Sequence, residues 1–216
     1  MPADPIHDKP LCPSHHPTGI PALHYTPLVD IPQWLMPYRH RVRPGQSVKG
    51  GAVHFSLFDA FFESVWNRPQ QVLRYLNGFQ AVLTPDFSLN AGMPLAVQLW
   101  NTYRTRWCGA HWQAQGYTVI PTVAWSTPSS YDFCFVGLPI HSPIALTTLG
   151  SQSHEGRAAF QHGFAALIER IQPSVILCYG DPLPGMERVP LQVYPDQWRS
   201  LKLAKQAAQK RLVDGR

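Results

Sequence analysis

The sequence predicts a single α/β domain whose mainly parallel strands form an incomplete (β/α) barrel of the TIM type, with an open doubly wound sheet as the alternative. Beyond residue 50, short apolar runs typical of buried strands alternate with longer segments that have helical apolar spacing. The chain has 216 residues, whereas a closed eight-stranded barrel normally needs about 250. We therefore expect one large core and a barrel that lacks part of its wall.

The first half of this domain is predicted to contain two strands and two helices. Residues 53–57 and 81–87 are short apolar runs of strand length. Residues 59–76 repeat large apolar side chains at the spacing of an amphipathic helix. A longer helix is expected over residues 94–116, because a proline opens it and a glycine follows its last turn.

The second half continues the alternation. Apolar runs at residues 118–125, 143–150 and 174–180 are predicted strands, and 189–194 adds a last one. Residues 155–171 carry inward-facing apolar side chains at helical spacing. Strands that alternate with helices of this length imply right-handed βαβ units and a parallel sheet covered on both faces.

Two appendages flank the predicted domain, which spans residues 51–195. Residues 1–50 are rich in proline and histidine and show no sustained period, so we expect an irregular arm. Residues 196–216 hold six basic residues against two acidic ones and are predicted to form a basic helix. Such a helix can bind the phosphates of a nucleic acid, or it can simply present a solvated face.

Cysteine usage and apolar run lengths indicate a cytoplasmic protein. The four cysteines are far apart and lie mostly in apolar runs, which suits buried thiols in a reducing compartment; they are Cys12, Cys108, Cys134 and Cys178. No apolar run approaches the roughly 18 residues of a membrane span. Only 14% of the residues are charged, so a host protein or a second copy of the chain is an expected partner.

The candidate site follows from the parallel sheet, because ligands bind at the carboxyl ends of such strands. Three carboxylates follow predicted strands and are the candidate catalytic residues: Asp86, Asp59 and Asp181. Ser88, Trp125, Thr148 and Tyr179 emerge at the same edge and are candidate substrate-binding residues. For Asp86, Ser88 and Asp59, an alternative role is to cap a helix or organise a turn.

The predicted helix over residues 94–116 adds three more candidates for substrate binding. Asn101 and Arg104 share one helix face, whereas Arg106 points elsewhere. A planar guanidinium suits a phosphate or carboxylate, and an internal salt bridge is the competing role. No nicotinamide or flavin fingerprint and no P-loop occurs, so the cofactor is unknown, with a divalent metal still open.

Several of these residues occur in motifs whose order resembles the family called domain of unknown function 4417. The motifs lie between residues 19 and 180 and include His54-Phe55, Pro85-Asp86-Phe87-Ser88, Asn101-Thr-Tyr-Arg104-x-Arg106-Trp107 and Val119-Ile-Pro-Thr-Val-x-Trp125. The resemblance implies a protein of phages, plasmids or other mobile elements, and it assigns no catalytic residue. The chain departs from the family's pattern at Phe58, where a second acidic residue often precedes Asp59.

Two functions therefore stay open from sequence. The first is an enzyme, hydrolase or nuclease-like, acting on a nucleotide or nucleic acid, with Asp86 as base or metal ligand and Arg104 holding a phosphate. The second is a non-catalytic protein that binds a nucleic acid or a host protein. Convergence of Asp86, Arg104 and a second carboxylate on one cavity would favour the enzyme, and internal pairing of the same side chains would favour the binder.

Overall fold

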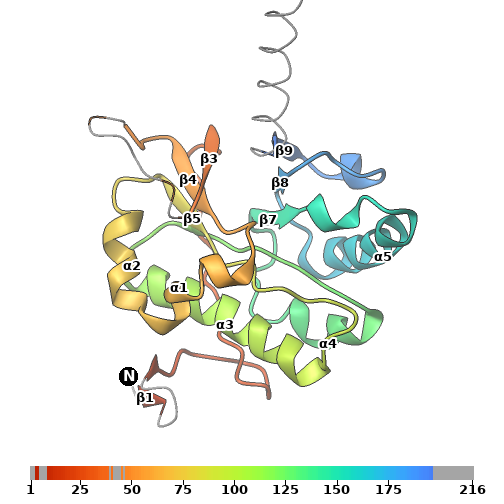
Figure 1. The fold of residues 1–216 in the computed structure, drawn as a ribbon, viewed down its shortest axis with the longest axis horizontal. Helices are drawn as coiled ribbons and strands as arrows, with labels where there is room; N and C mark the ends of the chain where they lie inside the picture. The colour runs from red at the N-terminus through yellow and green to blue at the C-terminus, as the bar shows by residue number, and fades with distance from the viewer. Residues whose placement is uncertain (1–2, 5–8, 39, 41–44, 46, 197–216) are drawn as a thin grey trace, which may run out of the picture.

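Parallel strands that follow one another in chain order form the centre of the molecule (Figure 1). The computed structural model describes residues 3–4, 9–38, 40, 45 and 47–196. One sheet has the order β3-β4-β5-β6 and the other β7-β8-β9, and a parallel bridge between Thr122 and Ala145 joins the two. The strands of this parallel set are β3 (Trp34–Pro37), β4 (Gly51–His54), β5 (Ala81–Leu83), β6 (Val119–Ile120), β7 (Ile144–Thr147), β8 (Ile176–Tyr179) and β9 (Leu191–Tyr194).

Helices fill most of the connections between successive strands. They are η1 (Asp59–Phe61), α1 (Ser64–Asn67) and α2 (Pro69–Leu76) after β4, α3 (Leu95–Ala114) after β5, η2 (Pro128–Ser130) and α4 (Tyr131–Cys134) after β6, η3 (Leu149–Ser151) and α5 (His154–Ile171) after β7, and η4 (Met186–Arg188) after β8. A separate antiparallel pair, β1 (Ala3–Asp4) and β2 (Lys9–Pro10), lies near the N-terminus. In Figure 1, α1 to α3 lie on the side of β3 to β5 and α5 lies beside β7.

The side chains that face the inside of the parallel set form one buried cluster to which every strand of the set contributes. Leu35, Leu83, Ala145 and Tyr194 come from β3, β5, β7 and β9, and Ala52, Ile120 and Leu177 come from β4, β6 and β8; all belong to one buried cluster. A TIM-type barrel fills its interior in this way. The strands therefore curve around a common core instead of forming a flat sheet.

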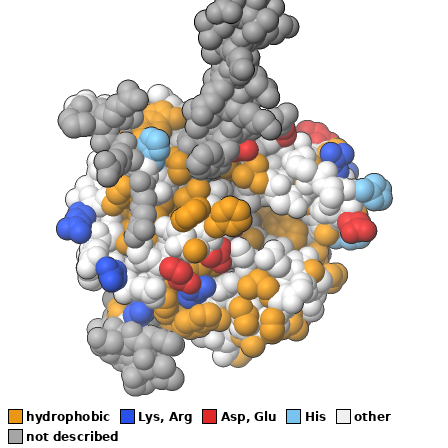
Figure 2. All heavy atoms as spheres, viewed as in Figure 1, with side chains coloured by type: hydrophobic (Ala, Val, Ile, Leu, Met, Phe, Trp, Pro, Cys, Tyr) orange, Lys and Arg blue, Asp and Glu red, His pale blue; other side chains and the backbone are white. Residues whose placement is uncertain are grey.

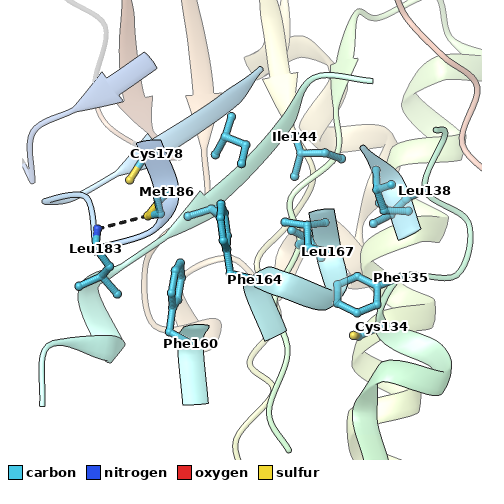
Figure 3. Close-up of a cluster of buried hydrophobic side chains, with 14 of the residues drawn as sticks. Cys134, Phe135, Leu138, Ile144, Phe160, Phe164, Leu167, Cys178, Leu183 and Met186 are labelled. Carbon is cyan, nitrogen blue, oxygen red and sulfur yellow. Dashed lines mark hydrogen bonds between the residues drawn. The ribbon is translucent and has the colours of Figure 1, made fainter. Parts of the chain in front are cut away.

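Two further apolar clusters fill the space between the strands and the outer helices. One joins Val53, Val82 and Val119 to α1, α2 and α3. The other joins Ile144 and Cys178 to α4 and α5, and Figure 3 shows Phe160, Phe164 and Leu167 of α5 directed at it. Alternate residues of each strand thus face the interior and the helices, as the period of two requires.

The predicted class is confirmed: the chain is a single α/β domain with mainly parallel strands and no closed barrel. No hydrogen-bonded ladder joins β9 back to β3 within the described ranges. Their contact is the Tyr194 hydroxyl, which donates to the carbonyl oxygen of Pro32. The helix expected over residues 94–116 is also present as α3, with Pro94 as N-cap and Gly116 at a φ of 84° just beyond its end.

Several segments differ from the sequence-based expectation or lie outside what the structure describes. The single helix expected over residues 59–76 is divided into η1, α1 and α2, because Pro69 opens a new helix. β3 forms within residues 1–50, where we expected only an irregular arm, and Ile20 and Leu23 of that arm are buried. The short helices η2 and α4 occur where no element was expected. The basic helix predicted over residues 196–216 falls beyond Asp196, outside the described residues, so it stays a prediction. None of the helices in the described ranges is both long enough and apolar enough to span a bilayer.

Candidate functional site

The carboxyl ends of β4 and β5 bring Asp59 and Ser88 into direct contact. Asp59 opens η1 just after β4, and Ser88 lies in the loop that leads from β5 to α3. The Ser88 backbone N–H donates to Asp59 Oδ2 at 3.1 Å, and the Ser88 hydroxyl donates to Oδ1 at 2.8 Å. Neither residue caps a helix with its side chain, since the N-caps of η1 and α3 are Phe58 and Pro94 and neither makes a side-chain bond. The contact instead fixes η1 against the loop before α3.

Asn101 and Arg104 extend this contact along α3. Asn101 Nδ2 donates to the Ser88 carbonyl at 2.7 Å, and Arg104 Nη2 donates to Asn101 Oδ1 at 2.6 Å. Arg104 Nη1 donates to both carboxylate oxygens of Glu63 at 2.8 Å, and the guanidinium carbon lies 3.8 Å from the centre of the Phe87 ring. The Asp59-Ser88-Asn101-Arg104-Glu63 network therefore connects η1, α1 and α3 through hydrogen bonds and one ion pair.

Asp86 lies beside this network and is not part of it. It accepts no hydrogen bond from any residue in the described ranges. Burial, and secondarily the charge of Asp59, raises the pKa of Asp86 to about 7. Desolvation thus favours the protonated form of the Asp86 carboxyl group.

Asp86 also borders a small cavity together with Arg106. The cavity measures about 10 Å³, close to the room that one water molecule needs, and is lined by Pro85, Asp86, Phe87, Leu89, Thr102, Thr105, Arg106, Thr122, Ala124 and Cys134. It lies where α3 and α4 pack against the ends of β5 and β6. A nucleotide does not fit in this volume, so any larger ligand requires the surrounding loops to move.

Arg106 braces the connection between β6 and β7. Its guanidinium is buried and donates to the carbonyl oxygens of Val136 at 3.0 Å, Thr122 at 3.1 Å and Cys134 at 2.7 Å. Desolvation lowers the pKa of Arg106 to about 10, so the group stays charged at neutral pH. Three carbonyl dipoles take the place of a carboxylate partner and engage three of the five N–H donors of the guanidinium.

The remaining candidates do not line the cavity beside Asp86. Trp125 packs against Phe160 of α5, with ring centres 5.1 Å apart. The Thr148 hydroxyl donates to the backbone carbonyl of Asp181 at 2.8 Å, and the Asp181 side chain is exposed. Tyr179 is buried inside the strands. The structure thus gathers Asp59, Asp86, Ser88, Asn101 and Arg104, and places Trp125, Thr148, Tyr179 and Asp181 elsewhere.

Two polar residues of this region were missed by sequence reasoning. Glu63 follows Asp59 by four residues, the spacing that places two side chains on one helix face, and this was a usable signal. His54 ends β4 in the barrel interior, where its ring lies 4.4 Å from that of Tyr179. Burial lowers the pKa of His54 to about 3, and its Nε2 atom has no hydrogen-bond partner in the described structure. Its apolar neighbours gave no sign of this in the sequence.

The structure also shows the state of the cysteines and whether possible metal ligands lie close together. All four cysteines are free thiols, and burial raises the pKa of Cys12 to about 11 and that of Cys134 to about 12. Three of the four are fully buried, which removes them from reaction with solvent. In the described ranges no group of three or more His, Cys, Asp or Glu side chains is positioned to hold a metal ion.

Comparison with known proteins identifies the family. The family model described as "Domain of unknown function (DUF4417)" matches residues 12–194. The chain belongs to this family. It is 43% identical over 184 residues to the Gene 1 protein of Mycobacterium phage L5, which covers 83% of this chain and 79% of that protein. It is 42% identical over 191 residues to the Gene 1 protein of Mycobacterium phage D29, with 86% and 70% covered. No solved structure matches the fold significantly.

Proposed function

We propose that this DUF4417 protein is a non-catalytic binding protein that docks onto another protein through a hydrophobic face beside the Asp59 network. The observation that carries this proposal is a contrast between polar and apolar groups. Asp59 and Arg104 are paired within the chain, apart from Arg104 Nε, which has no hydrogen-bond partner in the described structure, whereas large hydrophobic side chains next to them are exposed.

The polar network has little capacity left for a ligand. Both oxygens of Asp59 accept from Ser88, and both terminal nitrogens of Arg104 are occupied by Glu63 and Asn101. A phosphate would have to displace Glu63 from a guanidinium whose side chain is only 10% exposed. These internal pairs hold η1, α1 and α3 together and so fix the surface that these elements form.

The surface that the network supports is apolar. Phe58, the N-cap of η1, and Phe61, its last residue, are 80% and 58% exposed and touch each other edge to face, with ring centres 6.1 Å apart. We call Phe58, Asp59, Phe61 and Glu63 the η1 face; Leu95 and Val97, 49% and 40% exposed, lie in the first turn of the neighbouring α3. Figure 2 shows hydrophobic side chains gathered with acidic and basic ones over η1, α1 and α3. Exposed aromatic residues grouped in this way are typical of protein interfaces.

The relatives of the chain indicate where a partner would be found. Both Gene 1 proteins are encoded by phages. A phage protein works inside a bacterial host, so a host protein is the partner class that we propose for the η1 face.

The test is affinity capture with matched surface variants. The wild-type chain, Phe58→Ser/Phe61→Ser, and a control variant Tyr25→Ser/Val29→Ser are immobilised and exposed to extract of the host. Tyr25 and Val29 are 55% and 96% exposed, so the control removes a similar area of hydrophobic surface elsewhere. We expect at least one host protein that is retained by the wild type and the control and lost from the Phe58/Phe61 variant. Equal retention by all three would exclude the η1 face.

An enzyme acting on a nucleotide or nucleic acid is the second candidate, and the state of Asp86 favours it. A carboxyl group with a pKa of about 7, next to a second carboxylate and a cavity, is suited to general acid or base catalysis at neutral pH. The same function needs Arg104 to leave Glu63 and the loops to open, which is why we rank it second.

Its test is turnover of nucleoside triphosphates and of single- and double-stranded oligonucleotides, with and without Mg²⁺. If Asp86 is the acid or base, Asp86→Asn lowers the turnover rate by roughly a hundredfold or more. The control Asp132→Asn, at an exposed position, leaves the rate unchanged. Turnover that persists in Asp86→Asn would assign the chemistry to another residue, and no turnover by the wild type would leave the binding function.

A further inference from the structure

The cavity beside Asp86 is lined by polar groups that keep hydrogen-bonding capacity. Within the described ranges, the Asp86 carboxyl group makes no hydrogen bond, although the residue lines the cavity. Arg106 uses three of its five N–H donors on backbone carbonyls, so two are left. The hydroxyl groups of Thr102 and Thr122 donate to carbonyl oxygens, whereas that of Thr105 donates to none in the same part of the chain. The lining therefore offers donors and acceptors to a guest molecule.

The size of the cavity limits the guest to a single heavy atom. Its volume is about 10 Å³, which is close to the smallest space that holds one water molecule. Phosphate, a sugar or a nucleobase is several times larger. The candidates that fit are therefore a water molecule, an ammonium ion, a bare metal ion or a halide.

The charges around the cavity select among these candidates. A cation would lie beside the Arg106 guanidinium, which stays charged at neutral pH because its pKa is about 10. An anion would lie beside Asp86, whose own carboxylate form is already disfavoured by burial and by the charge of Asp59. Like charges in a poorly solvated site repel strongly. A neutral guest that both donates and accepts hydrogen bonds meets neither penalty, and water is such a guest.

We propose that the cavity is a binding site for one water molecule, which accepts an N–H of Arg106 and exchanges hydrogen bonds with Asp86 and Thr105. Buried polar groups in folded proteins are nearly always satisfied, and ordered water commonly satisfies them. The water joins α3, which carries Thr105 and Arg106, to the segment that follows β5. A substrate that uses Asp86 must displace or engage this water; that consequence rests on the second candidate function, whereas the binding of the water does not.

The first test is crystallography of the full-length chain with rubidium bromide as the probe. Both ions of this salt scatter anomalously, so each can be told from water. We expect one density peak within about 3.2 Å of both Asp86 and Arg106, without anomalous signal, in crystals with and without the salt. An anomalous peak in the cavity would assign it to a cation or to an anion, and a cavity without density would show that nothing binds there. Each of these results would overturn the proposal.

The second test counts long-lived internal water molecules in solution by oxygen-17 magnetic relaxation dispersion. Ala124→Val places two methyl groups at the cavity wall, so we expect this variant to hold one such water fewer than the wild type. The control Ala91→Val, at an exposed position, should keep the wild-type count. An unchanged count in Ala124→Val, in a chain with an unchanged circular dichroism spectrum, would contradict the proposal. If Ala124→Val does not fold, the wild-type crystals still decide.

Neither measurement involves a host partner or turnover of a substrate. The water site can therefore fail while the capture and turnover experiments succeed, and the reverse outcome is equally distinct.

Discussion

At the scale of single residues, Asp86 is a group whose charge state depends on the fold. Its pKa in the folded chain is about 7, above the ordinary value of 3.8, because burial and Asp59 disfavour the carboxylate. A raised folded-state pKa stabilises the protonated fold. This contribution is complete below about pH 4 and is lost as the pH rises through 7.

Asp86→Asn should therefore stabilise the protein at high pH and not at low pH. Asparagine imitates the protonated acid, so the variant and the wild type should unfold at the same denaturant concentration near pH 4. Near pH 8 the variant should be more stable by a few kcal/mol, because a shift of about three pKa units corresponds to roughly 4 kcal/mol. Urea titrations across this range measure the difference, with Asp132→Asn as the exposed control.

A stability difference between the variant and the wild type that is the same at both pH values would mean that the fold does not raise the pKa of Asp86. His54 does not affect the difference in stability between the two proteins. Its lowered pKa makes the fold less stable at low pH, which is opposite to the effect of Asp86. The His54 contribution is complete above about pH 6.5 and is lost as the pH falls toward 3, and it is present in both proteins.

At the scale of elements, α5 and the end of the β6 segment are held together by a side chain lying on a glycine. A Cβ atom on Gly163 would come within 2.1 Å of the Trp125 indole nitrogen. The Trp125 indole therefore packs directly against the backbone of α5 at Gly163, where a side chain would block it. This contact explains a glycine in the middle of a helix, where glycine is otherwise unfavourable by about 1 kcal/mol.

Gly163→Ala should destabilise the protein in spite of alanine's higher helix propensity. Displacing the indole costs about 1–3 kcal/mol, which exceeds the gain in propensity. Thermal unfolding followed by tryptophan fluorescence measures this loss. Gly92→Ala, where an added Cβ meets nothing within 4 Å, is the control and should be neutral. A more stable Gly163→Ala protein would contradict the placement of Trp125 on α5.

The sequence predicted the positions of helices and strands better than it predicted the side-chain contacts at the site. The α3 helix was predictable because Pro94 and Gly116 mark its ends, and the apolar runs located β4 to β9. β3 was not, because its four residues have no measurable period and end at a proline. At the site, the carboxyl-end rule placed Asp59 and Ser88 at neighbouring strand ends, where they are in contact. The same rule predicted Trp125, Thr148 and Tyr179 in one pocket with Asp86, and none of these three lines the cavity beside Asp86. It could not show that Arg106 bonds to three carbonyls, since those partners are backbone atoms 16 to 30 residues away.

At the scale of the whole molecule, one hydroxyl connects the two ends of the strand array. Tyr194→Phe removes the Tyr194 bond to the Pro32 carbonyl and keeps the ring in the interior cluster. We expect a loss of about 1–2 kcal/mol, because a buried acceptor is left unsatisfied, and a fall in Tm of a few degrees. Differential scanning calorimetry measures both. Tyr25→Phe, at an exposed position, is the control, and equal Tm values for the two variants would mean that β9 does not rest on β3.

The order of the strands has a consequence for how the chain acquires its fold during translation. From β3 to β9, every strand lies beside the one synthesised just before it, so each finds its template already outside the ribosome. Domains form as units while the chain emerges from its N-terminal end. The Tyr194 contact to Pro32 spans 162 residues and needs the last strand of the described parallel set. Folding of this set can thus follow synthesis strand by strand, with the meeting of β9 and the Pro32 segment after the other strands have paired.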